Sequence, residues 1–251
     1  MIMEGVAGKV KVAAVSYLNT KPLLYGLERL PVKDEIILSV DHPARIGEQL
    51  ISGEVDLGLI PVALIPRLKD HHVITDYCIG AEGPVASVCL FSDVPLEEIT
   101  AVYLDFESRS SVALARYLMR KYWKISPKLL EAGPGYEKQI TGTVAGVVIG
   151  DRALRQRKVS RYIYDLAEAW IDHTGLPMVF AAWISNKPLE EGFIARFNEA
   201  TGLGTRGPAL EEVLNRTTCD FYDLREYYTR HISFELTGRK KEGLAQFLEV
   251  L

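Results

Sequence analysis

Polar residues stand at three places where an apolar, strand-like run of the sequence gives way to a helix-like one. They are Ser16, Asn19 and Thr20 at the first junction, Ser108, Arg109, Ser110 and Ser111 at the second, and Gly150 and Asp151 at the third. Burying hydroxyl and amide groups costs free energy unless they cap a helix or hold a ligand. Because the amides and the macrodipole at a helix N-terminus favour negative charge, these residues indicate a site for a carboxylate.

Each junction also has a simpler interpretation. Serine and threonine are routine helix caps, so any one junction could be a cap and nothing more. A further hydroxyl, Ser87, falls inside the apolar strand GPVASVCLFS, where a lone serine is more often satisfied by a neighbouring carbonyl than functional. In open parallel sheets, however, ligands lie beyond the carboxyl ends of the strands. Three polar junctions in one chain therefore favour one shared cleft.

The sequence lacks the patterns of several other kinds of site. Its five histidines and three cysteines show no metal-ligand spacing, so we expect no bound metal. It contains no glycine-rich phosphate loop and no dinucleotide-binding turn. Nucleophilic catalysis lacks support as well, because no serine stands in a Gly-x-Ser-x-Gly elbow.

The composition is that of an ordinary globular protein. Of its 251 residues, 48% are hydrophobic and 25% are charged, and the formal net charge is -4. An acidic chain of this kind argues against nucleic acid or an anionic membrane as the main partner. We find no signal peptide and no run long enough to span a membrane. With cysteines that are odd in number and unpaired in spacing, we expect reduced thiols and a cytoplasmic location.

Strand-like and helix-like segments alternate, which predicts an α/β protein with parallel strands joined by helices. The expected strands cover residues 9–15, 35–40, 55–66, 99–105, 127–133, 144–151 and 177–185. The expected helices cover residues 21–30, 43–53, 111–123, 190–202, 208–217, 220–230 and 239–251. The simplest arrangement has two α/β lobes, with residues 1–93 and 185–251 in one lobe and residues 94–184 in the other.

Six segments together resemble those of one known family. They are VSYLNTKPLLYGL, ISGEVDLGLIPVA, GPVASVCLFS, LDFESRSSVALARYL, VVIGDRAL and DLAEAWIDHTGLPMVFAAW. In this order, between Val12 and Trp183, they resemble the chorismate dehydratases of the futalosine route to menaquinone, the MqnA family. Met178 stands where we expect phenylalanine in the family, and this change conserves volume.

The resemblance implies a type II periplasmic-binding-protein fold, with two lobes, each a central sheet flanked by helices, and a ligand cleft between them. It also implies that the protein is a carbon–oxygen lyase that converts chorismate to 3-[(1-carboxyvinyl)oxy]benzoate and water, without a cofactor. By the same resemblance, Asn19 and Ser87 are catalytic. The residues implied to bind the substrate are Ser16, Thr20, Ser108, Arg109, Ser110, Ser111, Gly150 and Asp151.

The general base and the class of function stay open at this point. Asp151 could orient the substrate, or the enolpyruvyl carboxylate of chorismate could itself take the proton. A non-catalytic carboxylate-binding protein of the same fold is the main alternative, although the sequence shows no export signal, lipidated cysteine or DNA-binding domain. Another small-molecule lyase on this scaffold is a third possibility.

Overall fold

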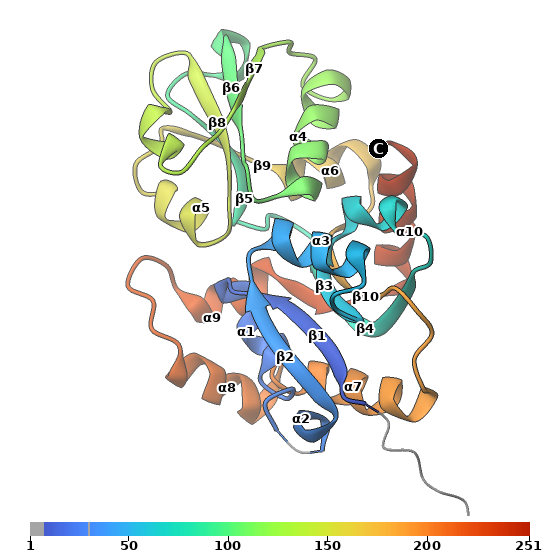
Figure 1. Cartoon of the computed structure of the whole chain (residues 1–251). Coiled ribbons are helices and arrows are strands. Elements are labelled where there is room, and N and C mark those ends of the chain that lie inside the picture. The colour runs from blue at the N-terminus through green and yellow to red at the C-terminus, as the bar shows by residue number, and fades with distance from the viewer. Residues whose placement is uncertain (1–7, 30) are drawn as a thin grey trace, which may run out of the picture.

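The computed structural model describes residues 8–29 and 31–251, which form two α/β lobes (Figure 1). The first lobe has a six-stranded sheet in the order β11-β4-β10-β3-β1-β2. Its strands are β1 (Val10–Val15), β2 (Ile36–Asp41), β3 (Leu57–Pro61), β4 (His72–Ala81), β10 (Met178–Ser185) and β11 (Ser233–Glu235). The second lobe has a five-stranded sheet in the order β7-β6-β8-β5-β9. Its strands are β5 (Val88–Ser92), β6 (Ala101–Leu104), β7 (Lys128–Glu131), β8 (Val144–Ile149) and β9 (Tyr162–Asp165).

Helices flank both sheets (Figure 1). Those of the first lobe are α1 (Lys21–Leu24), α2 (Val32–Glu35), α3 (Pro43–Ser52), α7 (Glu191–Leu203), α8 (Gly207–Arg216), α9 (Leu224–Glu226) and α10 (Gly238–Glu249). Those of the second lobe are α4 (Arg109–Lys121), α5 (Gly150–Gln156) and α6 (Leu166–Thr174). Short 3-10 turns are η1 (Leu18–Thr20), η2 (Val62–Arg67), η3 (Leu96–Glu98) and η4 (Tyr136–Gln139), and η5 (Tyr227–His231) is π-helical. No helix in the described part of the chain is long and apolar enough to cross a membrane.

The two sheets are mixed, and the expected parallel pairing holds only within the β-α-β units. β1 pairs in parallel with β2 and β3, and β6 pairs in parallel with β7 and β8. β10 runs antiparallel between β3 and β4, and β5 runs antiparallel between β8 and β9. These two antiparallel strands are the ones that the chain enters directly from the other lobe.

The chain crosses between the lobes at residues 82–87 and 175–177, so the observed lobe limits differ from the expected ones. β5 belongs to the second sheet and β10 to the first, whereas the limits after residues 93 and 184 placed each strand in the opposite lobe. Each crossing contains a glycine and a proline, but so does the turn at residues 133–135 within the second lobe, so these residues do not mark a crossing by themselves. Both strands are apolar runs, and only their distant hydrogen-bonding partners decide to which sheet they belong.

Three elements are shorter than expected. The strand expected over residues 55–66 ends at Pro61, where its pairing with β10 stops, and the 3-10 turn η2 follows. Of the helix expected over residues 21–30, the described residues 21–29 form the short α1 followed by turns, and Leu30 lies outside the described residues. A Cβ atom at Gly26 would lie 2.0 Å from the carbonyl oxygen of Ala200, so the backbone approaches α7 closely there. The helix expected over residues 220–230 is the short α9 followed by the π-helical η5.

Asp165 holds the first crossing against the second lobe. Its buried carboxylate accepts hydrogen bonds from the amides of Val85 (3.1 Å) and Ala86 (2.7 Å) in the crossing. It also caps α6, because it accepts from the amides of Ala167 (3.0 Å) and Glu168 (3.2 Å). The clamped turn is strained, since Ala86 has a φ of +63°, a region that residues other than glycine rarely occupy.

Replacing this carboxylate should destabilise the protein more than the loss of an ordinary cap. We expect Asp165→Ala to lower the free energy of unfolding by about 2–4 kcal/mol, because a cap is lost and two buried amides lose their acceptor. Asp223→Ala is the control, since exposed Asp223 caps only α9, through the Glu226 amide (3.1 Å). Its expected cost is about 0.5–2 kcal/mol. Equal losses in chemical denaturation would show that the crossing does not depend on Asp165.

Candidate active site

A cavity lies between the lobes, at the place where residues of both sheets and of the first crossing meet. Its apolar wall includes Val15, Leu59, Ile79 and Phe180 of the first lobe and Ile149 of the second. Its polar lining consists of Tyr17, Asn19, Thr20, Ser87, Ser108 and Ser111. None of the described residues that line it carries a charged side chain. The cavity can therefore hold an anion only through hydroxyl, amide and backbone N–H groups.

The structure brings many of the predicted site residues to this cavity and turns others away. Those that line it are Asn19, Thr20, Ser87, Ser108, Ser111 and Gly150. Ser16 and Arg109 are exposed and do not line it. The buried Ser110 hydroxyl instead accepts from the amide of Ala63 (3.1 Å) in the first lobe. Asp151 accepts from the Leu18 amide (3.1 Å), and burial raises the pKa of this carboxyl, against the effect of that amide.

The first junction is not a capped helix start. Thr20 precedes α1, but its hydroxyl donates to the carbonyls of Val15 and Tyr17 (both 2.7 Å) and caps no amide. Asn19 lies inside η1, and neither η1 nor α1 has a side-chain cap. Asn19 is therefore not a helix cap. Its half-buried amide group remains available to the cavity.

The second junction does contain a cap. The Ser108 hydroxyl accepts from the Ser111 amide (3.1 Å) and donates to the Ser111 hydroxyl oxygen (2.8 Å). The amides of Arg109 and Ser110, in the first turn of α4, have no hydrogen-bond acceptor among the described residues. First-turn amides lack partners within their own helix. These two amides and the Ser111 hydroxyl can therefore donate to a bound carboxylate.

Ser87 lies one residue before β5 and not inside a strand as expected. Its carbonyl accepts from the Gly150 amide (2.8 Å) across the second lobe's sheet. Gly150 has a φ of +61°, and a Cβ atom there would lie 3.3 Å from the Tyr17 ring, so any side chain would be strained and crowded. The Ser87 hydroxyl is not satisfied by a neighbouring carbonyl. It accepts from the Tyr227 hydroxyl at 2.7 Å.

Tyr227 is a residue that sequence reasoning missed. It is fully buried, and burial raises the pKa of its phenol, although hydrogen bonds with Ser87 and Asn19 act in the opposite direction. It belongs to η5, where the π-helical turn alters the side-chain register of the expected helix. The tyrosine pair at 227 and 228 is visible in the sequence, but nothing local indicates which hydroxyl reaches the cleft.

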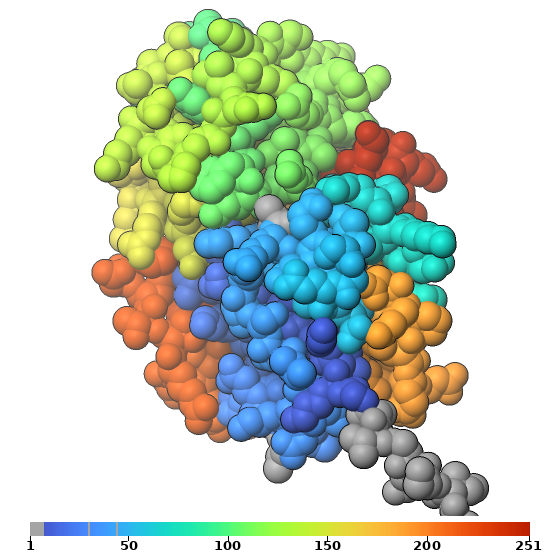
Figure 2. All heavy atoms as spheres, in the orientation of Figure 1, coloured from blue at the N-terminus to red at the C-terminus, as the bar shows by residue number. Residues whose placement is uncertain are grey.

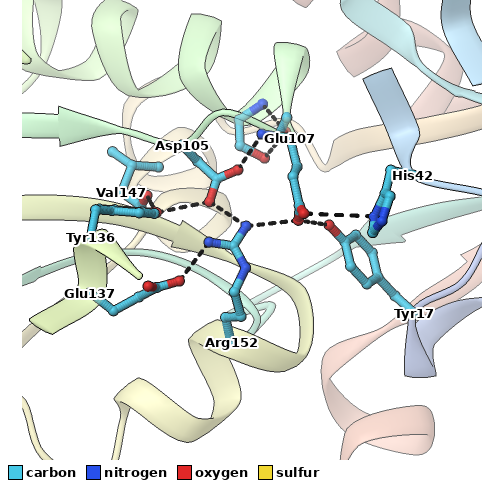
Figure 3. A network of polar contacts seen from close by, with 10 residues as sticks. Tyr17, His42, Asp105, Glu107, Tyr136, Glu137, Val147 and Arg152 are labelled. Carbon is cyan, nitrogen blue, oxygen red and sulfur yellow. Dashed lines mark hydrogen bonds and ion pairs between the residues drawn. The ribbon is translucent and has the colours of Figure 1, made fainter. Parts of the chain in front are cut away.

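A network of charged side chains lies at one rim of the cleft, in the second lobe (Figure 3). Arg152 pairs with the carboxylates of Asp105 (2.8 Å), Glu107 (2.8 Å) and Glu137 (2.6 Å). Asp105 also accepts from the Tyr136 hydroxyl at 2.8 Å. Burial raises the pKa of Asp105, and Arg152 opposes this shift. The guanidinium is occupied by protein carboxylates and is not directed at the cavity.

The rim network also joins the two lobes. Tyr17 of the first lobe donates a hydrogen bond to Glu107 of the second, and His42 Nδ1 lies 3.6 Å from another Glu107 oxygen (Figure 3). Burial, and then the contact with Glu107, raise the pKa of Tyr17, so its phenol remains a donor. In the space-filling view, the second lobe rests directly on the first along this side (Figure 2). The structure therefore represents a closed arrangement of the lobes.

The sequence model of the family described as "Menaquinone biosynthesis" matches residues 10–251. The chain belongs to this family. A chorismate dehydratase of Thermus thermophilus is 28% identical in an alignment of 237 residues that covers 83% of this chain and 84% of that protein. A chorismate dehydratase of Campylobacter jejuni is 24% identical in an alignment of 243 residues that covers 94% of each chain. The resemblance to the MqnA family is thereby confirmed.

Solved structures confirm the periplasmic-binding-protein-like fold. A protein of Archaeoglobus fulgidus matches with a TM-score of 0.72 at 11% identity, over 96% of each chain. An ABC transporter protein of Parabacteroides distasonis matches with a TM-score of 0.67 at 18% identity, over 97% of this chain and 92% of its own. A Candida albicans protein described as having the generic periplasmic binding protein fold matches with a TM-score of 0.64 at 14% identity, over 98% and 91%. At these identities the likeness concerns the fold alone.

The site of this family member is built for hydrogen bonding. Within residues 8–29 and 31–251, no group of three or more His, Cys, Asp or Glu side chains could hold a metal ion. The donors that line the cavity are Asn19, Ser87 and Ser111, and the first-turn amides of α4 lie between the lining residues Ser108 and Ser111. Such donors, fixed in a largely apolar cavity, can stabilise negative charge that develops on a bound molecule.

The hydrogen bond between Tyr17 and Glu107 should hold the lobes closed. We expect Tyr17→Phe to increase the radius of gyration of the ligand-free protein in small-angle X-ray scattering, because the variant keeps the ring and loses the bond across the rim. The free energy of unfolding should fall by no more than about 1.5–3 kcal/mol, the usual contribution of a hydrogen bond to a charged group.

The control is Tyr103→Phe, because the Tyr103 hydroxyl donates to Gln139 (2.6 Å) within the second lobe alone. This variant should scatter like the wild-type protein. An unchanged radius of gyration in Tyr17→Phe would show that the rim contact does not hold the lobes together.

Proposed function

We propose that this protein dehydrates chorismate to 3-[(1-carboxyvinyl)oxy]benzoate in menaquinone biosynthesis by the futalosine route. The observation that carries the proposal is one cavity in which Asn19, Ser87 and the N-terminus of α4 meet. Membership of the menaquinone-biosynthesis family and relatives named chorismate dehydratase support the same activity. The protein is then a hydro-lyase that acts on a small dianion.

The substrate carboxylates would be held by neutral donors. One carboxylate can accept from the amides of Arg109 and Ser110 and from the Ser111 hydroxyl, where the macrodipole of α4 also favours negative charge. Asn19 and Ser87 can donate to the other end of the molecule. The side chains of Ser16, Arg109, Ser110 and Asp151 lie outside the cavity lining, so we propose that they support the site without touching the substrate.

The reaction breaks one C–H bond and one C–O bond and forms water. The ring hydrogen beside the enolpyruvyl ether is acidic because the charge left behind spreads through the diene to the ring carboxylate. Donors aimed at that carboxylate stabilise this charge, which is usually the largest catalytic effect. The neighbouring hydroxyl then leaves as hydroxide and takes up a proton, and aromatisation drives its departure.

The substrate itself is the best candidate for the general base. No histidine or carboxylate is among the described residues that line the cavity, and Asp151 is engaged with the Leu18 amide. The enolpyruvyl carboxylate of chorismate is attached beside the hydrogen that must leave. An intramolecular base of this kind has a high effective concentration.

The proposal is tested by incubating the purified protein with chorismate in the presence of a metal chelator. We expect mass spectrometry to find a product lighter than chorismate by one water, because the proposed mechanism uses no metal. Binding of chorismate without conversion would instead indicate a non-catalytic carboxylate-binding protein. Turnover that requires an added divalent ion would contradict the metal-free mechanism.

Asn19→Ala separates catalysis from stability. Because Asn19 caps no helix, we expect only a small change in melting temperature. Turnover of chorismate should fall by about 10²–10³-fold, the usual effect of removing one donor to a developing charge. Asn215→Ala, at an exposed position of α8, is the control and should leave both quantities unchanged. A normal rate in Asn19→Ala would remove Asn19 from the catalytic site.

A further inference from the structure

The Tyr227 hydroxyl reaches the cavity indirectly. Tyr227 does not line the cavity, but its hydroxyl donates to Ser87 Oγ, which does, at 2.7 Å. This bond joins residues that are 140 positions apart in the sequence. Ser87 Oγ is fully buried and has no other hydrogen-bond partner among the described residues.

The donation from Tyr227 decides what the Ser87 hydroxyl can do. A serine hydroxyl has one proton and two acceptor lone pairs. Tyr227 occupies a lone pair, so the proton of Ser87 remains for a bound molecule. Thr20 is the opposite case in the same cavity, because its proton is already directed at the carbonyls of Val15 and Tyr17. Of these two hydroxyls, Ser87 is therefore the one that can donate to the substrate.

The Tyr227 hydroxyl remains able to donate to Ser87 at physiological pH. Burial raises the pKa of the Tyr227 phenol, so it keeps its proton throughout the physiological range. The Asn19 side chain also lies close enough to this phenol to lower its pKa. One phenol thus lies near both residues that the proposed function makes catalytic.

The turn that contains Tyr227 is hydrogen-bonded both to η1, which carries Asn19, and to the first crossing, which carries Ser87. The next residue, Tyr228, donates to the carbonyl of Leu18 in η1 at 2.9 Å. At the end of the same π-helical turn, His231 Nδ1 lies 2.9 Å from the carbonyl of Pro84 in the first crossing. Single π-helical turns occur frequently at functional sites. Here the turn places a phenol between η1 and the crossing that carries Ser87.

We propose that Tyr227 is a positioning residue that fixes Ser87 as a hydrogen-bond donor to the charge developing on the substrate. The inference rests on the proposed function and deepens it. Tyr227 touches no substrate, and no proton moves to or from its hydroxyl. Without this hydroxyl, the Ser87 side chain can rotate and donate its proton to another acceptor.

The first test is Tyr227→Phe, which keeps the buried ring and removes only the hydroxyl. We expect kcat on chorismate to fall by about 10–100-fold, less than for outright loss of a donor, with KM nearly unchanged. Tyr103→Phe is the control, because the Tyr103 hydroxyl donates to Gln139 (2.6 Å) and Tyr103 does not line the cavity. Tyr227→Phe should lose about 2–4 °C in melting temperature, the shift expected for one buried hydrogen bond in a chain of this size. Tyr103→Phe should keep a near-normal kcat.

The deciding test is the double-mutant cycle of Tyr227→Phe with Ser87→Ala. If Tyr227 acts mainly through Ser87, the double variant should turn over chorismate at nearly the rate of Ser87→Ala alone. If the wild-type protein is active and the rate losses of the two single variants add in the double variant, the role of Tyr227 is overturned and the proposed function stays intact. A wild-type protein that leaves chorismate unchanged would overturn the proposed function, and the role of Tyr227 with it.

Discussion

The carboxylate of Asp165 governs the geometry of the cleft, because it binds the crossing segment and the start of α6 at the same time. A buried carboxylate is costly unless its oxygens are well hydrogen-bonded, and four backbone amides offset that cost here. The hydrogen bonds to Asp165 hold Ala86 in a strained conformation, and Ser87 is the next residue in the chain. Strain of this kind persists only where the surroundings determine the backbone. From this fixed position the Ser87 carbonyl meets Gly150 and its hydroxyl meets Tyr227.

The separation of charge between rim and cavity suits the proposed reaction. Arg152 is neutralised by three carboxylates at the rim, while the described lining of the cavity is uncharged. A cation in the cavity would bind chorismate and its transition state almost equally, and such uniform binding lowers KM without raising kcat. Neutral donors aimed at the place where charge develops bind the transition state more strongly than the substrate, and this difference raises kcat.

The sequence was informative where a local rule applies. Polar groups at strand-to-helix junctions indicated Asn19, Ser108, Ser111 and Gly150, and all of these line the cavity. The same rule also indicated residues that do not line the cavity, because junction residues a few positions apart can face opposite sides of a turn. These are Ser16, Arg109, Ser110 and Asp151. Features that depend on distant parts of the chain could not be predicted. The lobe that β5 or β10 joins depends on distant pairing partners. The contact of Tyr227 with Ser87 spans 140 positions and requires a π-helical turn.

In the proposed mechanism, closure of the lobes also brings the hydrogen-bond donors together. The Tyr17 ring packs against Gly150 while its hydroxyl reaches Glu107, and the Ala63 amide donates to Ser110, so each contact joins the two lobes. An open cleft would lose these contacts and admit water, which weakens every electrostatic interaction inside. Ser87 lies on the crossing itself and Asn19 on the first lobe, whereas the α4 amides belong to the second. The donors therefore converge on one molecule only when the lobes close around it, and a fold shared with ligand-binding proteins can in this way supply the preorganisation that catalysis needs.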